Sequence, residues 1–126
     1  MVLTEMNVEF ASPVPVYEQI KKKIKYTIAK KSLTANESLP SIRELASFLK
    51  INPNTVARAY RDLAREDIID GRAGKGYWVK ETGHLEHEKE TMLKEEFSMF
   101  LERAVELGFS RERLKEMVTG FFKEDT

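Results

Sequence analysis

The most constraining feature of the sequence is a pair of amphipathic helical patterns separated by only three or four residues. The first begins at Ser41, which forms an S-x-x-E capping box with Glu44 ahead of an apolar stripe. The pattern breaks at residues 50–53, where Asn52 is a good N-cap and Pro53 suits the first position of a new helix. The apolar stripe of this new helix consists of Val56, Tyr60, Leu63 and Ala64. Two helices joined so closely are the sequence form of a helix-turn-helix.

A further helix is predicted upstream of this pair. The run from Ser12 to Pro15 favours an extended backbone, because proline disfavours helix in the residue before it. From Val16 onward the pattern indicates an amphipathic helix of about four turns. Its apolar positions are Tyr17, Ile20, Ile24 and Ile28.

A β-hairpin is predicted downstream of the pair. Two short β-prone runs, at residues 68–69 and 77–79, flank a glycine-rich connector at residues 71–76. The connector carries Arg72 and Lys75, so the tip of the hairpin is basic. Helix, turn, helix and basic hairpin together describe a winged helix.

A different pattern occupies the C-terminal third of the chain. Apolar residues repeat at spacings of four and three residues, which predicts a long helix that Gly108 ends. Ser110 can cap a last helix with a second apolar stripe that includes Met117. Because one helical hairpin cannot bury so many aromatic side chains, we expect a second copy of the chain to cover them. The residues expected at this dimer contact are Leu93, Phe97, Phe100, Leu101, Ala104, Leu107, Leu114, Val118, Phe121 and Phe122.

The expected fold is therefore mainly α with a small β-hairpin. Residues 1–81 are expected to form a winged helix-turn-helix domain, with a flexible or extended arm at residues 1–13. Residues 82–126 are expected to form a two-helix dimerisation segment.

The zero net charge of the chain conceals a split between its two parts. Residues 1–83 carry 14 Lys and Arg against 10 Asp and Glu, a balance of +4, whereas residues 84–126 carry 7 against 11, a balance of −4. A basic front part suggests a polyanionic partner. No apolar run is long enough to span a membrane, and no signal peptide precedes the first helix, so we expect a cytoplasmic protein.

The sequence lacks the residues and motifs that would indicate an enzyme. It has no cysteine, only two histidines and no phosphate-binding loop of the P-loop kind, and it implies no cofactor. His84, His87 and Glu88 could share one helix face and bind a metal ion, although linker histidines are usually just solvated.

The exposed face of the second helix of the pair fits DNA. The major groove is about 12 Å wide and admits one helix, whose N-terminal residues then meet base edges. Asn54, Thr55 and Arg58 are placed to do this, and the glycines of the hairpin let its backbone approach a groove closely. A winged helix that contacts only protein or RNA is the alternative, but that reading predicts an apolar or acidic helix face, whereas this one carries Arg58, Arg61 and Arg65.

Four ordered motifs resemble the GntR family of regulators. They are Leu39-Pro40-Ser41-Ile42-Arg43-Glu44-Leu45-Ala46, Asn52-Pro53-Asn54-Thr55-Val56-Ala57-Arg58-Ala59-Tyr60, Gly74-Lys75-Gly76-Tyr77-Trp78-Val79 and, upstream, Pro15-Val16-Tyr17-Glu18-Gln19-Ile20. The last of these is similar to the small YtrA-like branch. The resemblance implies a dimeric bacterial regulator, usually a repressor, with a short two-helix C-terminal segment, often controlling a transporter operon.

The resemblance also implies site residues. It places DNA contacts at Arg43, at the recognition-helix positions Asn54, Thr55 and Arg58, and at the hairpin tip. Other branches of the family carry arginines where this chain has Pro53 and Ala57, so base contacts known there do not transfer. Two usual glycines of the family are here Asn36 and Asp67; Asn tolerates a left-handed backbone, and Asp does so less readily.

The sequence thus predicts a sequence-specific transcription regulator, a repressor that binds an inverted-repeat operator as a homodimer. No pocket for a small-molecule effector is readable from the pattern, so the identity or existence of an effector stays open. The expected DNA contacts are Ser41, Arg43, Asn54, Thr55, Arg58, Tyr60, Arg61, Arg72, Gly74, Lys75 and Gly76.

Overall fold

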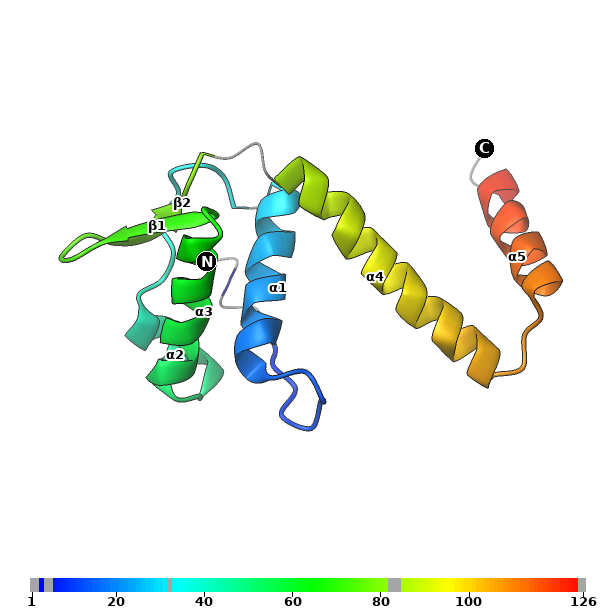
Figure 1. Cartoon of the computed structure of the whole chain (residues 1–126), viewed down its shortest axis with the longest axis horizontal. Helices are drawn as coiled ribbons and strands as arrows, with labels where there is room; N and C mark the ends of the chain where they lie inside the picture. The colour runs from blue at the N-terminus through cyan, green and yellow to red at the C-terminus, as the bar shows by residue number, and fades with distance from the viewer. Residues whose placement is uncertain (1–2, 4–5, 32, 82–84, 125–126) are drawn as a thin grey trace. The chain divides into compact units, whose positions relative to one another are not determined.

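The two closely spaced helices are present in the structure, a computed structural model that describes residues 3, 6–31, 33–81 and 85–124 (Figure 1). Helix α2 spans Ile42–Leu49 and helix α3 spans Pro53–Arg65. The Ser41 hydroxyl accepts a hydrogen bond from the Glu44 amide at 3.0 Å, and the Glu44 carboxylate accepts one from the Ser41 amide at 3.4 Å. Asn52 caps α3, since its side-chain oxygen accepts from the Asn54 amide at 2.8 Å. The predicted caps therefore set both helix starts.

Helix α1, Val16–Ala29, packs with α2 and α3 around one apolar core. Figure 1 shows α1 and α3 side by side, with α2 at the lower end of α3. Each helix packs its predicted apolar stripe against this core, with Tyr17 and Ala64 only half-buried. The fully buried side chains from these helices include Ile20, Ile24, Leu45, Val56, Tyr60 and Leu63.

The predicted hairpin forms an antiparallel pair of strands, β1 at Ile69–Arg72 and β2 at Gly76–Val79. Ile69 pairs with Val79 and Arg72 pairs with Gly76. A third segment that the sequence did not predict lies along β2, where Ser38 forms an isolated antiparallel bridge with Trp78. Backbone bonds from the Leu39 amide to Tyr77 and from the Asn36 amide to Val79 fix it there. The polar stretch before α2 is therefore tied to the hairpin.

The described residues of the expected N-terminal arm pack on the domain. Leu3 and Met6 are buried in its core. The Gln19 side chain bonds both backbone groups of Glu9, accepting from its amide at 2.8 Å and donating to its carbonyl at 2.9 Å. These contacts hold residues 6–9 against the start of α1.

Helix α4, Leu85–Glu106, and helix α5, Arg111–Glu124, complete the chain. The chain divides into two compact units, residues 1–89 and residues 90–126, so the first turn of α4 belongs to the winged helix. Leu85 is buried there. The expected boundary between residues 81 and 82 adjoins residues 82–84, which lie outside the described part.

In the second unit, the sequence signals between the helices act as predicted. Gly108 has a φ of 86°, and the Phe109 amide bonds the Ala104 carbonyl at 3.0 Å. The Ser110 hydroxyl accepts from the Arg113 amide at 3.1 Å, which caps α5. These bonds close α4 and start α5 within a few residues.

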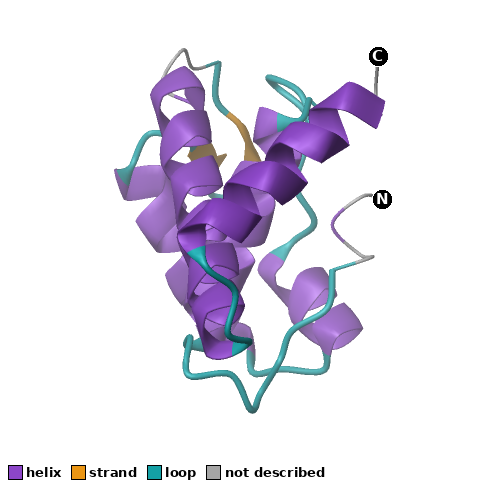
Figure 2. Cartoon of the chain, turned by 90° about the vertical axis from the view of Figure 1, so that its right-hand side faces the viewer, coloured by secondary structure: helices purple, strands orange, loops and turns teal. Residues whose placement is uncertain are grey.

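The fold class is confirmed: in the part of the chain that the structure describes, five α-helices and one two-stranded hairpin make a winged helix followed by a helical segment (Figure 2). Within the described residues, no helix is both long and apolar enough to cross a membrane.

Candidate nucleic-acid interface

The exposed face of α3 carries the predicted reading residues. Asn54, Arg58 and Arg61 are exposed, and Thr55 is half-buried. The guanidinium carbon of Arg58 lies 3.7 Å from the centre of the Tyr17 ring on α1. A cation held over an aromatic face gains about 0.5–1 kcal/mol at an exposed site. Arg58 is therefore oriented by α1 as well as by its own helix.

The start of α2 adds two exposed side chains to this surface. Ser41 accepts its bond from Glu44 but keeps its own hydroxyl proton to donate. Arg43, two residues further on, is exposed. A short hydroxyl and a guanidinium at a helix start suit contact with phosphate oxygens.

Tyr60 is a correction to the predicted contact set. Its side chain is fully buried, and its hydroxyl donates to the Pro40 carbonyl at 2.7 Å. Burial raises the pKa of Tyr60, with a smaller contribution from the charge of Glu44, so the hydroxyl stays protonated and keeps donating. Tyr60 lies in the apolar stripe of α3, and this position buries its side chain although the residue belongs to the family motif. Tyr60 thus supports the interface from beneath and does not reach a ligand.

The hairpin tip exposes both its glycine backbone and two positively charged side chains. Gly74 and Gly76 have φ values of 82° and 79°, a region that residues with a Cβ rarely adopt. The Lys75 amide bonds the Arg72 carbonyl at 2.9 Å, which closes the turn, and both side chains are exposed. The tip can therefore lie close to a phosphate backbone.

The base of the hairpin depends on a third glycine. A Cβ at Gly71 would lie 2.6 Å from two carbon atoms of the Tyr77 ring. That ring packs edge-on against Tyr60, with ring centres 4.9 Å apart. Gly71 thus lets an aromatic side chain cover the strand and connect the hairpin to the core.

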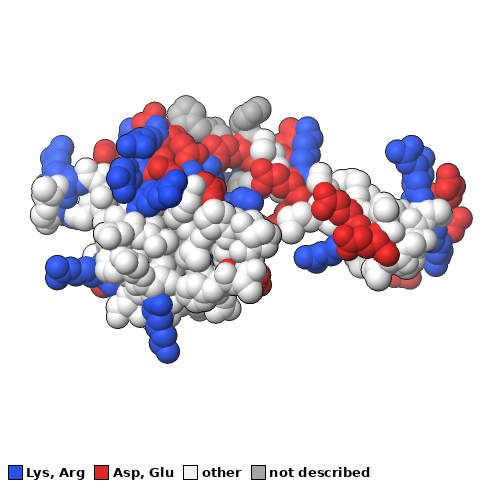
Figure 3. Space-filling view, turned by 60° about the horizontal axis from the view of Figure 1, so that its bottom comes forward, with Lys and Arg blue, Asp and Glu red and all other residues white. Residues whose placement is uncertain are grey.

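Two lysines of α1 are neutralised by carboxylates. Lys21 Nζ lies 3.0 Å from Glu66 and 3.5 Å from Asp62, both on or beside α3. Lys25 Nζ lies 2.6 Å from Glu66 and 3.4 Å from Glu88 on α4. Figure 3 shows positive and negative side chains interleaved over the winged helix, with a run of Asp and Glu along α4. Lys21 and Lys25 are therefore occupied by carboxylates, whereas Arg43, Arg58, Arg61, Arg72 and Lys75 are exposed.

The pKa shifts in this network agree with its geometry. Burial alone would lower the pKa of Lys21, but the hydrogen bond and charge of Glu66, with the charges of Glu18 and Asp62, raise it overall. Burial alone would raise the pKa of Glu66, but bonds and charges from Lys25 and Lys21 lower it overall. Both groups are therefore charged near neutral pH.

The side chains expected at a dimer contact are mostly exposed in the chain. Leu93, Leu107 and Phe121 are each at least 71% exposed, and Phe97 stacks on Phe100 with ring centres 6.3 Å apart. The other exposed members are Leu101, Val118 and Phe122. Ala104 is buried within its own chain and Leu114 is half-buried, so these two are already covered.

The alternative of a metal site at His84, His87 and Glu88 falls largely outside the described part, because His84 and the His87 side chain are not described. Among the described residues, no group of three or more His, Asp or Glu is arranged to hold a metal ion.

A model of bacterial regulatory proteins of the gntR family matches residues 16–79, the span from α1 to the end of β2. The chain belongs to this family and is a transcriptional regulator with a GntR DNA-binding domain.

Its similarity to particular relatives extends through the C-terminal helices. It is 34% identical over 117 residues to the HTH-type transcriptional regulator YhcF of Bacillus subtilis, covering 92% of this chain and 97% of YhcF. It is 36% identical over 115 residues to the HTH-type transcriptional repressor YtrA of the same organism, covering 90% and 88%. A GntR family regulator from Listeria monocytogenes has a TM-score of 0.71 at 30% identity, covering 88% of this chain and 98% of that structure. These matches confirm the YtrA-like resemblance and a regulator rather than an enzyme.

Proposed function

We propose that this regulator is a repressor that binds an inverted-repeat operator as a homodimer, placing α3 in the major groove and the hairpin tip on the adjacent backbone. The observation that carries the proposal is the group formed by exposed Asn54 and Arg58 and half-buried Thr55 at the start of α3, with Arg58 held by Tyr17. Repression is proposed from the name of the relative YtrA. A bacterial regulator of this kind acts on DNA in the cytoplasm.

Arg58 is proposed to read base edges. It lies one turn into α3, where a bidentate contact to guanine contributes about 1–3 kcal/mol of discrimination. The Arg58→Ala variant should therefore lose more affinity for the operator than for random duplex DNA in a mobility-shift assay. Arg113→Ala, which changes an exposed arginine on α5, is the matched control. Equal losses on both DNAs would contradict base reading.

The hairpin tip is proposed to contact phosphate only. Lys75→Ala should weaken operator and random DNA to a similar degree and reduce the salt slope by about one unit. An unchanged slope would place Lys75 away from the DNA. If the wild-type chain shows no salt-dependent DNA binding at all, the protein- or RNA-contact alternative replaces the proposal.

The dimer is proposed to form through the exposed apolar faces of α4 and α5. A charge at Phe121 is tolerated in one chain because the side chain is 75% exposed, but it would be costly within a packed contact. Sedimentation of Phe121→Asp should therefore give a monomer, and specific operator affinity should fall while weak non-specific binding remains. Thr119→Asp, off the apolar stripe, is the control. A Phe121→Asp variant that stays dimeric at micromolar concentration would move the contact elsewhere.

A further inference from the structure

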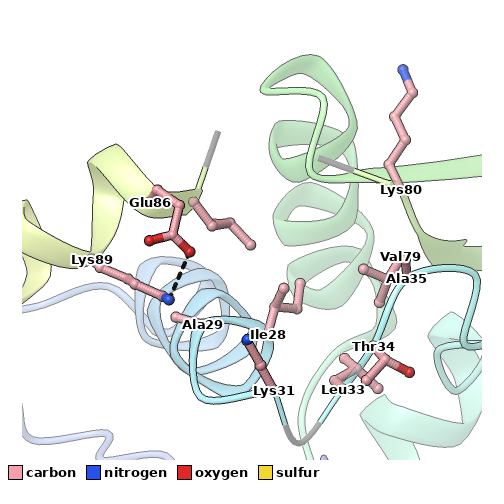
Figure 4. A pocket seen from close by; sticks show the side chains of 11 residues that line it. Ile28, Ala29, Lys31, Leu33, Thr34, Ala35, Val79, Lys80, Glu86 and Lys89 are labelled. Carbon is pink, nitrogen blue, oxygen red and sulfur yellow. Dashed lines mark hydrogen bonds and ion pairs between the residues drawn. The ribbon is translucent and has the colours of Figure 1, made fainter. Parts of the chain in front are cut away.

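A pocket of about 250 Å³ lies in the winged-helix unit, away from α2 and the hairpin tip (Figure 4). Its walls come from the end of α1, the segment at residues 33–35, the end of β2 and the first turn of α4. All of the residues that line it belong to the described part of the chain.

The floor of this pocket is apolar. Leu33 and Val79 are at most 1% exposed, and Ile28 and Leu85 are also buried. At roughly 30 Å³ for each water-sized group, the volume holds about eight non-hydrogen atoms. The pocket therefore fits a small molecule with a short apolar body.

The rim of the pocket is positively charged. Three lysines, Lys31, Lys80 and Lys89, line it with one carboxylate, Glu86. Lys80 is paired with Asp67 at 3.2 Å outside the pocket, and in Figure 4 its side chain points away from the other two.

The remaining charges converge on one side. Figure 4 shows the ammonium groups of Lys31 and Lys89 directed toward the side of the pocket where Glu86 lies. Lys89 Nζ is 2.8 Å from a Glu86 oxygen, and the charge of Lys31 also acts on this carboxylate. Two positive charges against one negative charge leave a single positive charge unmatched, which suits a monoanion.

We propose that this pocket binds a small organic monoanion with a short apolar body, of which a short-chain carboxylate is the simplest case. The carboxylate lies between Lys31 and Lys89 and accepts from both ammonium groups. The alkyl body lies against Ile28, Ala29 and Leu85, which keep some accessible surface above the fully buried Leu33 and Val79. Leu85 and Lys89 lie in the first turn of α4 and the other lining groups come from α1, residues 31 and 33–35 and the end of β2, so the ligand contacts several elements of the winged-helix unit.

Hexanoate is the probe, since it has eight non-hydrogen atoms and one negative charge. In an NMR titration of the full chain, hexanoate should shift the backbone amides of Leu33, Thr34 and Lys89 in a saturable way, with a Kd on the order of 1 mM for so small a ligand. Hexan-1-ol and hexylammonium, which keep the body and change the charge, should bind at least about tenfold more weakly.

Lysine variants test the anchoring groups. Lys31→Ala and Lys89→Ala should each raise the Kd for hexanoate about tenfold, because each removes a charge-assisted hydrogen bond at a partly exposed site. Lys94→Ala, which removes an exposed lysine one turn further along α4, should leave the Kd unchanged. Equal binding of hexan-1-ol, an unchanged Kd in both pocket variants, or shifts confined to residues 90–124 would overturn the proposal.

Discussion

The buried Tyr60 hydroxyl provides a sharp test of how the helix-turn-helix is held together. It donates to the carbonyl of Pro40 at 2.7 Å, and Pro40 directly precedes the N-cap of α2. This bond therefore ties the middle of α3 to the start of α2. Tyr60→Phe keeps the ring, including its edge-on contact with Tyr77, and removes only the hydroxyl.

The expected loss follows from two contributions. A typical intramolecular hydrogen bond contributes about 1 kcal/mol net, and a buried carbonyl left without a donor costs about 1–3 kcal/mol. Both estimates describe the loss of the same hydrogen bond, so they are not added together. We therefore expect Tyr60→Phe to lower the free energy of unfolding by about 2 kcal/mol. For a unit of this size, that corresponds to a Tm lower by roughly 8–16 °C.

Fluorescence of Trp78 reports this change, because it is the only tryptophan in the sequence and lies on β2 of the winged helix. Tyr26→Phe is the matched control, since the Tyr26 side chain is 52% exposed, and its stability should stay within about 0.5 kcal/mol of wild type. A Tyr60→Phe variant with the same Tm as this control would refute the structural role assigned to the hydroxyl.

Four further predictions follow from the same unit. The pKa of Glu66 is lowered in the folded state, so its contribution to stability is present above about pH 4.5 and is lost as the pH falls through the lowered pKa. In the Glu66→Gln variant, the free energy of unfolding should therefore fall less steeply at acid pH than in the wild type. An unchanged slope at acid pH would contradict this. Asp67 has a φ of 61°, a strained value for a residue with a Cβ. Asp67→Gly should therefore raise the free energy of unfolding by up to about 1 kcal/mol and raise the Tm slightly. A lower Tm would show that no strain is relieved. Gly71→Ala should destabilise the hairpin by about 1–3 kcal/mol in denaturant titrations, because its Cβ would meet an aromatic ring 2.6 Å away, and wild-type stability would refute the tight fit. Tyr17→Ala should reduce operator selectivity in the same direction as Arg58→Ala, and Tyr17→Phe should restore it; two variants with equal selectivity would show that the ring does not position Arg58.

Local sequence signals predicted the helices and strands of the winged helix. The contacts between these elements depend on residues far apart in the sequence and could not be predicted in the same way. The caps at Ser41 and Asn52 and the apolar stripes depend on neighbours within one or two turns, so they are readable from the sequence. The pairing of Ser38 with Trp78 joins residues forty positions apart, and no local pattern marks it. The left-handed conformations of Asn36 and Asp67 were suggested only by the glycines that the family resemblance placed there.

The same distinction explains the candidate interface. The polar character of Asn54 and Arg58 is visible in the sequence, but the stacking of Arg58 on Tyr17 requires α1 to cross α3 at that level. The sequence gives residues 1–83 a charge balance of +4, but it does not show that Lys21 and Lys25 face Glu66 across the helix pair. A net charge count along a sequence therefore does not show which positive side chains are available to a polyanion.

The first turn of α4 is packed into the winged-helix unit. Leu85 is buried in the winged-helix unit and Glu88 lies 3.4 Å from Lys25, so this turn moves with the DNA-binding domain. The helix continues without a break to Glu106, 22 residues or about 33 Å in all. A ligand that packs on Leu85 and Lys89 would therefore contact the one turn of α4 that is packed into the winged-helix unit.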